Sequence, residues 1–425
     1  MRKSKWFVFL AVLSVFALLG AACADDEPTD GDQTGAGATE TCEADEFGCV
    51  EVAEGEPLTL GTLLVISGEN AQLGQDSQNG AVLGADYIDG AFDGTAELLG
   101  HPIEFEHQDD GCSAEGGTAG ARSLVSDKDR IAAVIGTSCS SAALGVADTI
   151  LGDEGVVLIS PSNTSPDLAG PDHHPFYFRT AHNDLIQGAE MARFVSEELG
   201  HTKAATIHDG STYADGLQQA FADAFAEGGG EITAQEAVQV GDKDMSPVLT
   251  QIGGTGPEFL FYPVFIPEGG AITAQARESA DLEGVDLGGA DGMFSPDFIE
   301  AAGPENAEGV YLSGPDLEFA GSFYADEFLP AYEDQFGDTT SVFHAHSFDA
   351  VQLVLKAIEQ VAIQEGGTTY IPRTGLRDAL AETEGYEGIV GALTCDENGD
   401  CNPGASMSVS VVKNGDFKTI WRSSE

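Results

Sequence analysis

The stretch LTLGTLLVISGENAQLGQDSQNGAVLGADYI, residues 58–88, decides the fold class. Residues 58–66 are largely apolar and include β-branched side chains, which is typical of a buried strand. After a polar loop, apolar side chains recur at helical spacing, at Ala81, Val82, Ala85 and Ile88. A buried strand followed by an amphipathic helix is the building unit of a parallel α/β sheet.

The same alternation continues outward along the chain. Strands are expected at 101–107, 131–135, 156–159, 204–207 and 259–262, and helices at 118–125, 140–150, 184–199, 213–225 and 269–279. Mostly apolar strands between amphipathic helices imply parallel sheets that are covered on both faces. The array is long enough for two doubly wound α/β sheets, and it contains no repeat that would indicate a solenoid.

The charge of the chain argues against a nucleic-acid-binding protein. Among 425 residues there are 17 basic and 72 acidic ones, a net charge of −55. A nucleic-acid-binding protein needs clustered Lys and Arg to replace phosphate counterions, so this class is excluded. The composition fits a solvated, self-repelling surface, and an acidic patch for a basic partner is the alternative.

The first 22 residues form a signal peptide. Basic residues precede the apolar run 6–19, which is shorter than the ~20 residues that span a bilayer. Small residues follow, and then Cys23, in an order that resembles a bacterial lipobox. We therefore expect Cys23 to be lipidated and to anchor the exported chain to the outer face of the cytoplasmic membrane. Because Gly20 and Ala22 also suit ordinary signal peptidase, plain secretion is the alternative.

Residues 23–56 are expected to form an acidic tether behind the anchor. The stretch 24–56 is rich in Asp and Glu and contains no Lys or Arg. Such a segment has too little apolar surface to order itself, and charge repulsion keeps it extended.

The cysteines support export. Apart from Cys23 there are six, and an even number in an exported chain favours disulfides over metal ligation. Many pairings are open to six cysteines, but proximity in the sequence suggests Cys42–Cys49, Cys112–Cys139 and Cys395–Cys401.

Two other segments contain side chains that could ligate a metal ion. His344 and His346 lack a third ligand nearby, so no metal is expected there. The acidic segment 396–400 resembles part of a calcium loop, but it lacks the complete spacing and is interpreted as a turn between strands. No metal and no cofactor is expected.

Three loops after expected strands, 67–74, 136–141 and 160–164, are rich in hydroxyl groups and glycine. Ligands of open α/β sheets bind at such carboxyl ends of strands. Ser140 and Ser141 open a helix there, where free backbone N–H groups and a hydroxyl can receive a carboxylate. The alternative is that Ser140 is only an N-cap.

Signatures of enzymes are mostly absent. There is no GxSxG elbow, P-loop, GxGxxG after a strand or HExxH motif. A secreted hydrolase with Ser140 as nucleophile would need a base in reach, and His208 is only the nearest candidate by strand position.

Several short motifs together resemble a known family. In order they are SG at 67–68 with AQLG at 71–74, DDGC at 109–112, VIG at 134–136 with CSS at 139–141, DEGV at 153–156 with ISP at 159–161, HD at 208–209 with YADG at 213–216, and SFDA at 347–350. Over residues 57–425 the chain resembles the type I periplasmic solute-binding proteins, in particular the branched-chain amino-acid group.

The resemblance implies two α/β lobes that are joined by three hinge crossings and close on a ligand. One lobe would comprise residues 57–181 and 315–403, and the other residues 182–314 and 404–425. It further implies that the Cys112–Cys139 disulfide lies near the ligand.

The resemblance also implies a set of ligand-binding residues, which are Leu73, Ser140, Ser141, Ser162, Thr164, Tyr213, Phe265 and Asp291. The Ser and Thr residues would hold the ligand carboxylate, and Asp291 with Tyr213 would hold its ammonium group. Leu73 and Phe265 would shape the side-chain pocket. Without the resemblance, Asp291 would be a solvated turn residue and the two aromatic residues core residues.

The function that follows is that of a non-enzymatic solute-binding lipoprotein of an ABC importer. As a monomer it would capture an amino acid, with branched-chain ones among the candidates, and deliver it to the permease. The alternatives are a ligand-sensing domain for a membrane receptor and the binding of an amide or another small polar solute.

Overall fold

The computed structural model describes residues 37–170, 173–318 and 322–423. Residues 38–425 form one compact unit. No helix in the described ranges is long and apolar enough to cross a membrane. The expected signal peptide and Cys23 lie outside the described residues.

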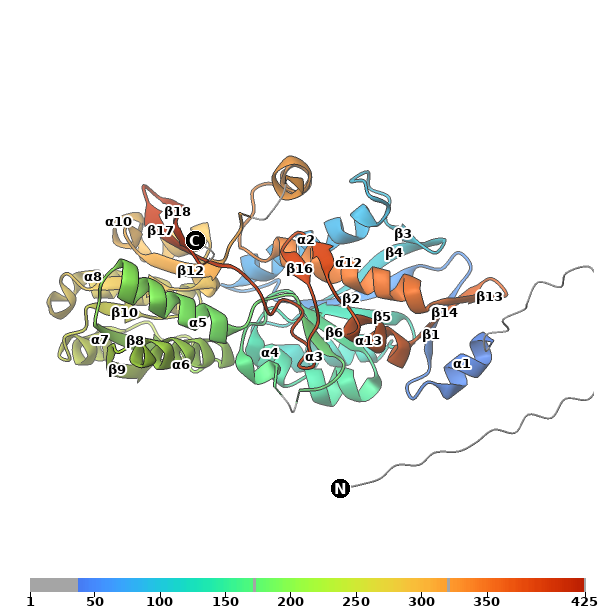
Figure 1. Cartoon of the computed structure of the whole chain (residues 1–425), viewed down its shortest axis with the longest axis horizontal. Helices are drawn as coiled ribbons and strands as arrows, with labels where there is room; N and C mark the ends of the chain where they lie inside the picture. Colours follow the sequence, from blue (N-terminus) through green and yellow to red (C-terminus); the bar gives the residue numbers. More distant parts are fainter. Residues whose placement is uncertain (1–36, 171–172, 319–321, 424–425) are drawn as a thin grey trace, which may run out of the picture. The chain divides into compact units, whose positions relative to one another are not determined.

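The first large sheet contains β2, which is the strand of the stretch 58–88, and five further strands (Figure 1). Its order is β3-β4-β2-β5-β6-β7. The strands are β2 (Leu58–Leu64), β3 (Glu97–Leu98), β4 (His101–Asp109), β5 (Ile131–Gly136), β6 (Val157–Ser160) and β7 (Tyr177–Arg179). All pairs are parallel except β3 with β4. Every residue of β2 is buried, as a strand covered on both faces requires.

Helices cover this sheet. They include α2 (Ala71–Asp86), α3 (Ala114–Val125), α4 (Ser140–Leu144), α12 (His344–Val361) and α13 (Arg373–Ala381). Helices α2 and α12 pack closely against each other, because glycine allows close approach. A Cβ added at Gly80 would lie 2.0 Å from the carbonyl oxygen of His344. The helix expected at 140–150 is divided, because α4 ends at Leu144 and a π-helical turn follows over Ala147–Leu151.

The second large sheet has the order β18-β17-β12-β11-β10-β8-β9. Its strands are β8 (Lys203–His208), β9 (Glu231–Ala237), β10 (Phe259–Phe261), β11 (Asp286–Gly289), β12 (Tyr311–Pro315), β17 (Met407–Lys413) and β18 (Asp416–Arg422). The pairs among β8 to β12 are parallel, and β17 and β18 add an antiparallel edge.

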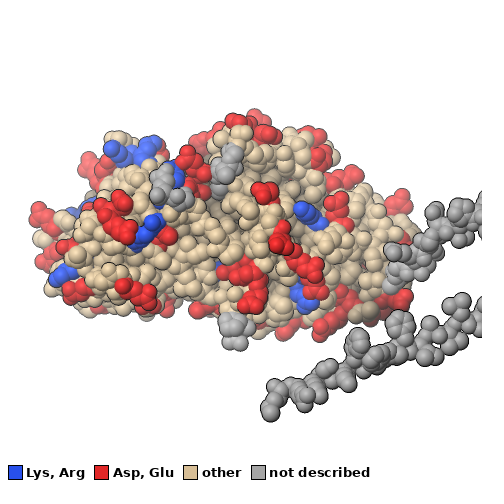
Figure 2. Space-filling model, in the orientation of Figure 1, with Lys and Arg blue, Asp and Glu red and all other residues tan. Residues whose placement is uncertain are grey.

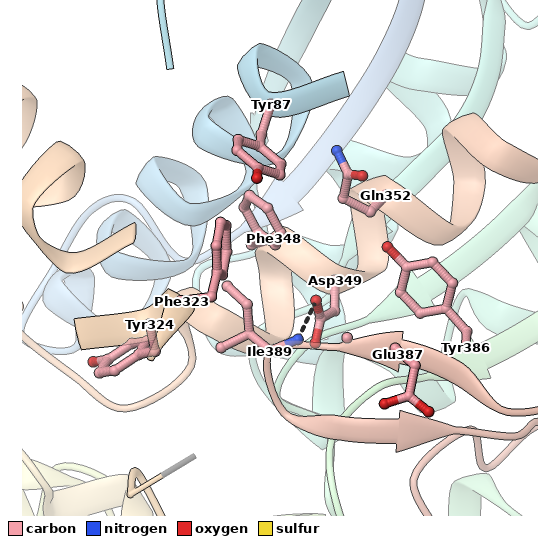
Figure 3. A pocket seen from close by; sticks show the side chains of 10 residues that line it. Tyr87, Phe323, Tyr324, Phe348, Asp349, Gln352, Tyr386, Glu387 and Ile389 are labelled. Carbon is pink, nitrogen blue, oxygen red and sulfur yellow. Dashed lines mark hydrogen bonds between the residues drawn. The ribbon is translucent and has the colours of Figure 1, made fainter. Parts of the chain in front are cut away.

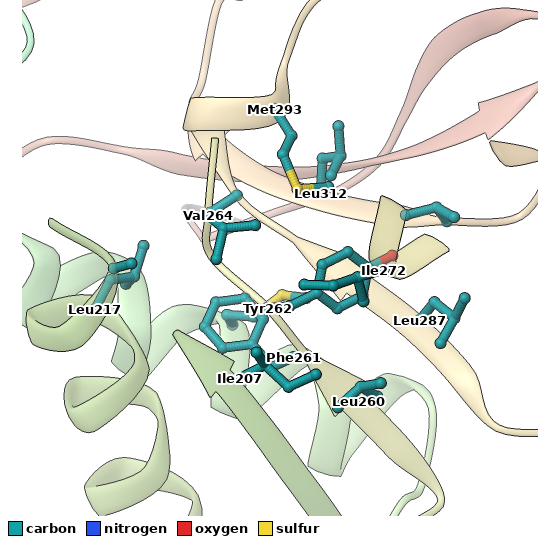
Figure 4. Packing of buried hydrophobic residues seen from close by; sticks show 14 of the residues in the cluster. Ile207, Leu217, Leu260, Phe261, Tyr262, Val264, Ile272, Leu287, Met293 and Leu312 are labelled. Atoms are coloured by element: carbon teal, nitrogen blue, oxygen red, sulfur yellow. The ribbon is translucent and has the colours of Figure 1, made fainter. Parts of the chain in front are cut away.

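The helices of the second sheet are α5 (Asp184–Arg193), α6 (Thr212–Glu227), α7 (Ser246–Gly253), α8 (Ile266–Glu278), α9 (Pro296–Ala302) and α10 (Pro304–Ala307). The helix expected at 184–199 again ends in a π-helical turn, Phe194–Glu198. Figure 4 shows the core, where Ile207 and Leu260 of the strands pack with Leu217 of α6 and Ile272 of α8. Two sheets of this kind confirm the predicted doubly wound α/β class.

The chain passes from one sheet to the other at three places in the described ranges. It leaves the first sheet after β7, returns after β12 through α11 (Leu329–Phe336) to α12, and crosses again between β16 (Gly391–Leu393) and β17. A buried ion pair between Arg179 and Asp400 joins two of these crossings. Arg179 Nη2 donates to Asp400 Oδ2 at 3.0 Å, and Arg179 Nη1 donates to the Ser165 carbonyl oxygen at 2.7 Å.

The expected tether is wrong for residues 38–56, which are folded. They form α1 (Ala38–Ala44) and β1 (Cys49–Ala53), and β1 pairs antiparallel with β14 (Thr368–Pro372), which also pairs with β13 (Ile363–Glu365). Val50 and Val52 are buried on one face of β1. They alternate with the exposed Glu51 and Ala53, which makes a half-buried strand, and the acidic composition of the whole segment does not reveal this pattern. Residues 24–36 lie outside the described ranges.

Among the described residues, three disulfides form in the pairs suggested by proximity in the sequence: Cys42–Cys49, Cys112–Cys139 and Cys395–Cys401. The last closes the acidic segment after β16. There Asp396 Oδ1 accepts hydrogen bonds from the N–H groups of Asn398 and Asp400, so the segment is a turn. The described residues contain no group of three or more His, Cys, Asp or Glu side chains arranged for a metal ion.

The surface reflects the composition. In the face shown in Figure 2, Asp and Glu side chains are spread over the molecule and Lys and Arg side chains are few. Negative charge therefore predominates on this face, while the site described below is built from buried groups.

Candidate functional site

The loops at the carboxyl ends of the strands meet between the two sheets. Leu73, in the first turn of α2, lies there opposite Phe265, the N-cap of α8, and Asp291, which follows β11. The three line one pocket, together with Asn70, Gln72, Ile266, Gly292, Phe294, Ser295 and Ser341. The structure thus brings together residues of both sheets that are far apart in the sequence.

Asp291 is buried and hydrogen-bonded. Its Oδ1 accepts from Gln187 Nε2 at 2.7 Å and from the Tyr213 hydroxyl at 3.3 Å. Only 4% of the residue is exposed, so the alternative of a solvated turn residue is wrong. Burial raises the pKa of Asp291, and His182, Gln187 and Tyr213 oppose that rise. A buried carboxyl of this kind favours a positively charged partner.

Tyr213 supports this carboxyl from α6. Its hydroxyl oxygen also accepts the backbone N–H of Gly292 at 3.1 Å, which positions the ring against the turn after β11. The centroid of the Tyr213 ring lies 5.2 Å from that of Phe265. Tyr213 and Phe265 are both buried and form one aromatic wall beside Asp291.

Ser140 and Ser141 begin α4, but neither is its N-cap. That position is held by Cys139, so the N-cap alternative for Ser140 is wrong. Ser140 Oγ accepts from the N–H of Ser165 at 3.4 Å, and Ser141 Oγ accepts from the N–H of Thr212 at 3.0 Å. The backbone N–H groups of both serines have no hydrogen-bond acceptor among the described residues. They are the donors that a carboxylate would use.

Ser162 and Thr164 lie beside the start of α4. The Ser162 hydroxyl donates to the Ser138 carbonyl oxygen at 3.0 Å, and the Thr164 carbonyl oxygen accepts from the N–H of Asp184 at 2.9 Å. The Thr164 hydroxyl is buried and has no hydrogen-bond partner among the described residues. The hydroxyl-rich loops of the first sheet therefore contact the first turn of α5.

Three residues of the site were missed from the sequence: His182, Asp184 and Gln187. Gln187 Nε2 donates to Asp291 and to Ser313, while its Oε1 accepts from His182 Nε2 at 2.6 Å. Asp184 is fully buried, and burial and the Asp291 carboxylate raise its pKa well above the usual range. Asp184 and Gln187 share one face of α5 at spacing i, i+3, which is the one signal that could have indicated them.

The arrangement between the sheets is closed. The pocket at Asp291 holds about 10 Å³, room for about one water molecule. The hydrogen bond from Thr212 to Ser141 and an ion pair of Lys243 with Glu69 at 3.9 Å span the gap. A ligand the size of an amino acid can enter only if these contacts separate.

Comparison with known proteins supplies a family for this geometry. Residues 57–416 match the family model described as "Periplasmic binding protein". The Leu/Ile/Val-binding protein homolog 3 of Brucella melitensis is 26% identical over 363 residues, which are 85% of this chain and 93% of that protein.

Two solved structures match most of the chain as well. A leucine-binding protein from Thermotoga maritima has a TM-score of 0.75 at 25% identity, over 86% of this chain and 98% of that one. The branched-chain amino acid transporter substrate-binding protein of Streptococcus pneumoniae in complex with isoleucine has a TM-score of 0.73 at 26% identity, over 86% and 99%.

Proposed function

Because the chain belongs to the periplasmic binding protein family, whose members bind solutes without transforming them, we propose that it captures an amino acid between its lobes for an ABC importer. The observation that carries the proposal is the buried Asp291 carboxyl. It lies between the two sheets, and among the described residues no Lys or Arg side chain is paired with it. A ligand ammonium would supply the missing charge.

The ligand carboxylate has a matching set of donors. The free N–H groups of Ser140 and Ser141 begin α4, and the buried Thr164 hydroxyl lies nearby without a hydrogen-bond partner among the described residues. The Ser162 hydroxyl would have to release the Ser138 carbonyl oxygen before it could donate to the ligand. Donors on the first sheet and an acceptor on the second suit a zwitterion that bridges the two. The proposal therefore assigns the carboxylate to the first lobe and the ammonium to the second.

The side-chain pocket favours an apolar ligand. Leu73, Phe265, Ile266 and Phe294 line the space beside Asp291. Burial of a leucine-sized side chain against such a lining contributes ~1.5–3 kcal/mol. The relatives named for leucine, isoleucine and valine support the same ligand class.

Binding would work by closure of the two lobes. We propose that they comprise residues 57–181 with 315–403 and residues 182–314 with 404–425, and that they move at the three crossings. A ligand that contacts both lobes binds the closed state better than the open one and shifts the equilibrium by that difference. The closed state would then be the form that the permease recognises, with the chain held at the membrane through lipidated Cys23.

Calorimetric titration tests the proposal with matched ligands. Leucine, isoleucine and valine are titrated beside leucinamide, which lacks the carboxylate, and 4-methylpentanoate, which lacks the ammonium. We expect saturable binding of at least one amino acid and at least about tenfold weaker binding of both analogues. Equal binding of 4-methylpentanoate would contradict the role of Asp291, and binding of none of the amino acids would contradict the proposed ligand class.

A further inference from the structure

A second cavity lies in the first lobe, apart from the site between the sheets. It measures about 270 Å³ and shares no lining residue with the pocket at Asp291. Its walls come from the end of α2, the chain before α11, α12 and the hairpin of β15 (Tyr386–Gly388) and β16. Its lining residues are Tyr87, Phe323, Tyr324, Phe348, Asp349, Gln352, Tyr386, Glu387, Gly388 and Ile389.

Aromatic rings dominate this cavity. The Tyr87 ring centroid lies 4.9 Å from that of Phe323 and 5.8 Å from that of Phe348, so these three side chains form one packed group. In Figure 3 they lie on one side of Asp349, and Tyr386 lies on the other. Aromatic faces carry partial negative charge and attract cations.

Tyr386 shows this attraction within the molecule. Lys356 Nζ lies 4.9 Å from the centroid of the Tyr386 ring. Lys356 lines a neighbouring cavity and not this one, whereas Tyr386 lines both. Among the described residues, no Lys or Arg lines the cavity around Asp349.

Asp349 places a buried carboxyl group beside the rings. Its Oδ1 accepts from the N–H of Ile389 and its Oδ2 from the N–H of Val390, each at 2.9 Å. The hairpin packs tightly on the carboxylate, since a Cβ added at Gly388 would lie 2.5 Å from Asp349 Oδ2. Asp349 is fully buried, and burial raises its pKa to about 7. The two hydrogen bonds from the hairpin fix the position of this carboxyl group beside the cavity.

The remaining groups agree with a cationic occupant. The Glu387 side chain points away from the rings in Figure 3 and adds a second carboxylate at the rim. Gln352 donates its amide to the Gly84 carbonyl oxygen and is therefore committed to the helix pair α2 and α12. An aromatic wall, one buried carboxyl group and a carboxylate at the rim suit a cation whose charged atom carries alkyl groups.

We propose that this cavity binds a small alkylammonium cation, with the charge above Asp349 and the alkyl groups against Tyr87, Phe323, Phe348 and Tyr386. A quaternary ammonium fits the chemistry because it needs no hydrogen-bond acceptor and buries its methyl groups against rings. The alternative cation, a lysine side chain of a partner protein, is an outcome of the test.

The test is a calorimetric titration of the full chain with choline, beside its neutral isostere 3,3-dimethylbutan-1-ol. We expect saturable choline binding with a Kd below about 1 mM, and at least about tenfold weaker binding of the neutral compound. Absence of choline binding in this range, or equal binding of both compounds, would overturn the proposal. Tighter binding of a lysine-containing peptide than of choline would overturn the small-molecule assignment.

Variants locate the binding. Asp349→Asn keeps the shape of the side chain, and it should weaken choline binding at least about tenfold, as should Tyr386→Leu, which remains available if the first variant folds poorly. The matched control Glu384→Gln removes a carboxylate from the chain before the same hairpin, outside this cavity, and should leave Kd unchanged. Unchanged binding in both test variants, or loss of choline binding on Asp291→Asn, would overturn the proposal by placing the cation elsewhere.

Discussion

Asp291 shows how much of a site can depend on one residue. Its carboxylate is held by Gln187 and Tyr213 in a place that water hardly reaches. Its hydrogen bonds orient it but leave its charge without a Lys or Arg counterion among the described residues. A ligand ammonium is therefore the natural complement, and the residue can be tested by itself.

Asp291→Ala should weaken amino-acid binding by ~2–5 kcal/mol, because the ligand ammonium would be buried without its partner. Calorimetric titration with the amino acid that binds the wild type measures the loss. Asp297→Ala is the matched control, since Asp297 is an exposed carboxylate a few residues further along the chain. Wild-type affinity in the Asp291 variant would show that the ammonium is held elsewhere.

Asp110 is another buried carboxyl group, and its ionisation should make stability depend on pH. Its oxygens accept from the N–H groups of Cys112 and Ser138, at 2.7 and 2.6 Å, and join the loops after β4 and β5. Burial raises its pKa from 3.8 to about 7. The neutral form is therefore favoured by folding, and its stabilising contribution is complete below pH 3.8 and lost as the pH rises through about 7.

Comparison with Asp110→Asn isolates this effect. The free energy of unfolding of the wild type, minus that of the variant, should fall by roughly 1 kcal/mol per pH unit between the two pKa values. Urea unfolding at several pH values from about 4 to about 8 measures the difference. A difference that stays constant or grows with pH would show that Asp110 is ionised in the folded protein throughout.

At the scale of elements, β1 decides whether the N-terminal segment is a tether or part of the fold. It extends the small sheet through β14, and Phe47 packs edge-on against Phe176 with ring centroids 5.1 Å apart. Asp45 accepts hydrogen bonds from the backbone and the hydroxyl of Thr374. Residues 38–56 are thus attached to β14, Phe176 and Thr374.

Val50→Thr tests this attachment, because threonine keeps the shape of valine but buries a hydroxyl. The expected loss of stability is about 1–3 kcal/mol, measured by urea unfolding. Glu51→Gln changes the neighbouring residue, whose side chain is exposed on the other face of β1, and should have little effect. Equal stability of both variants would mean that β1 is detached in solution.

The Cys112–Cys139 disulfide joins two elements beside the proposed carboxylate site, since Cys139 is the N-cap of α4. Its removal in Cys112→Ala/Cys139→Ala should lower the free energy of unfolding by ~2–4 kcal/mol, because the unfolded chain gains freedom. Chemical denaturation measures the loss without a reductant, which would also open the other disulfides. An unchanged midpoint would contradict the contribution of this disulfide.

At the scale of the whole molecule, the net charge of −55 acts on every part of the fold. Repulsion between like charges destabilises a compact state, and salt screens it by shortening the Debye length from ~30 Å at about 10 mM to ~3 Å at about 1 M. The melting temperature should therefore rise with NaCl over this range. A neutral sugar at the same osmolality is the control, and an equal rise with that sugar would contradict charge screening.

Much of this protein could be predicted from local patterns in the sequence. The alternation of apolar strands and amphipathic helices predicts the doubly wound sheets, since each element repeats its own period. The disulfides join cysteines that are near in the sequence. The hydroxyl-rich loops after β2, β5 and β6 could be selected as candidate site loops because ligands of open α/β sheets bind at the carboxyl ends of strands. Leu73, Phe265 and Asp291 were placed by the resemblance, and the structure brings them to one pocket.

Other features were decided only by the tertiary structure. Gln187 reaches Asp291 across 104 positions of the chain, and no local period records that contact. The acidic composition of residues 38–56 does not indicate the strand β1, because Val50 and Val52 are buried only when β1 pairs with the distant strand β14. The cavity beside Asp349 is formed by residues at the end of α2, in α12 and in the β15–β16 hairpin. The sequence of each segment alone gives no sign of a cavity. Such sites depend on which surfaces meet, and that follows from packing of the whole chain rather than from the preferences of any one segment.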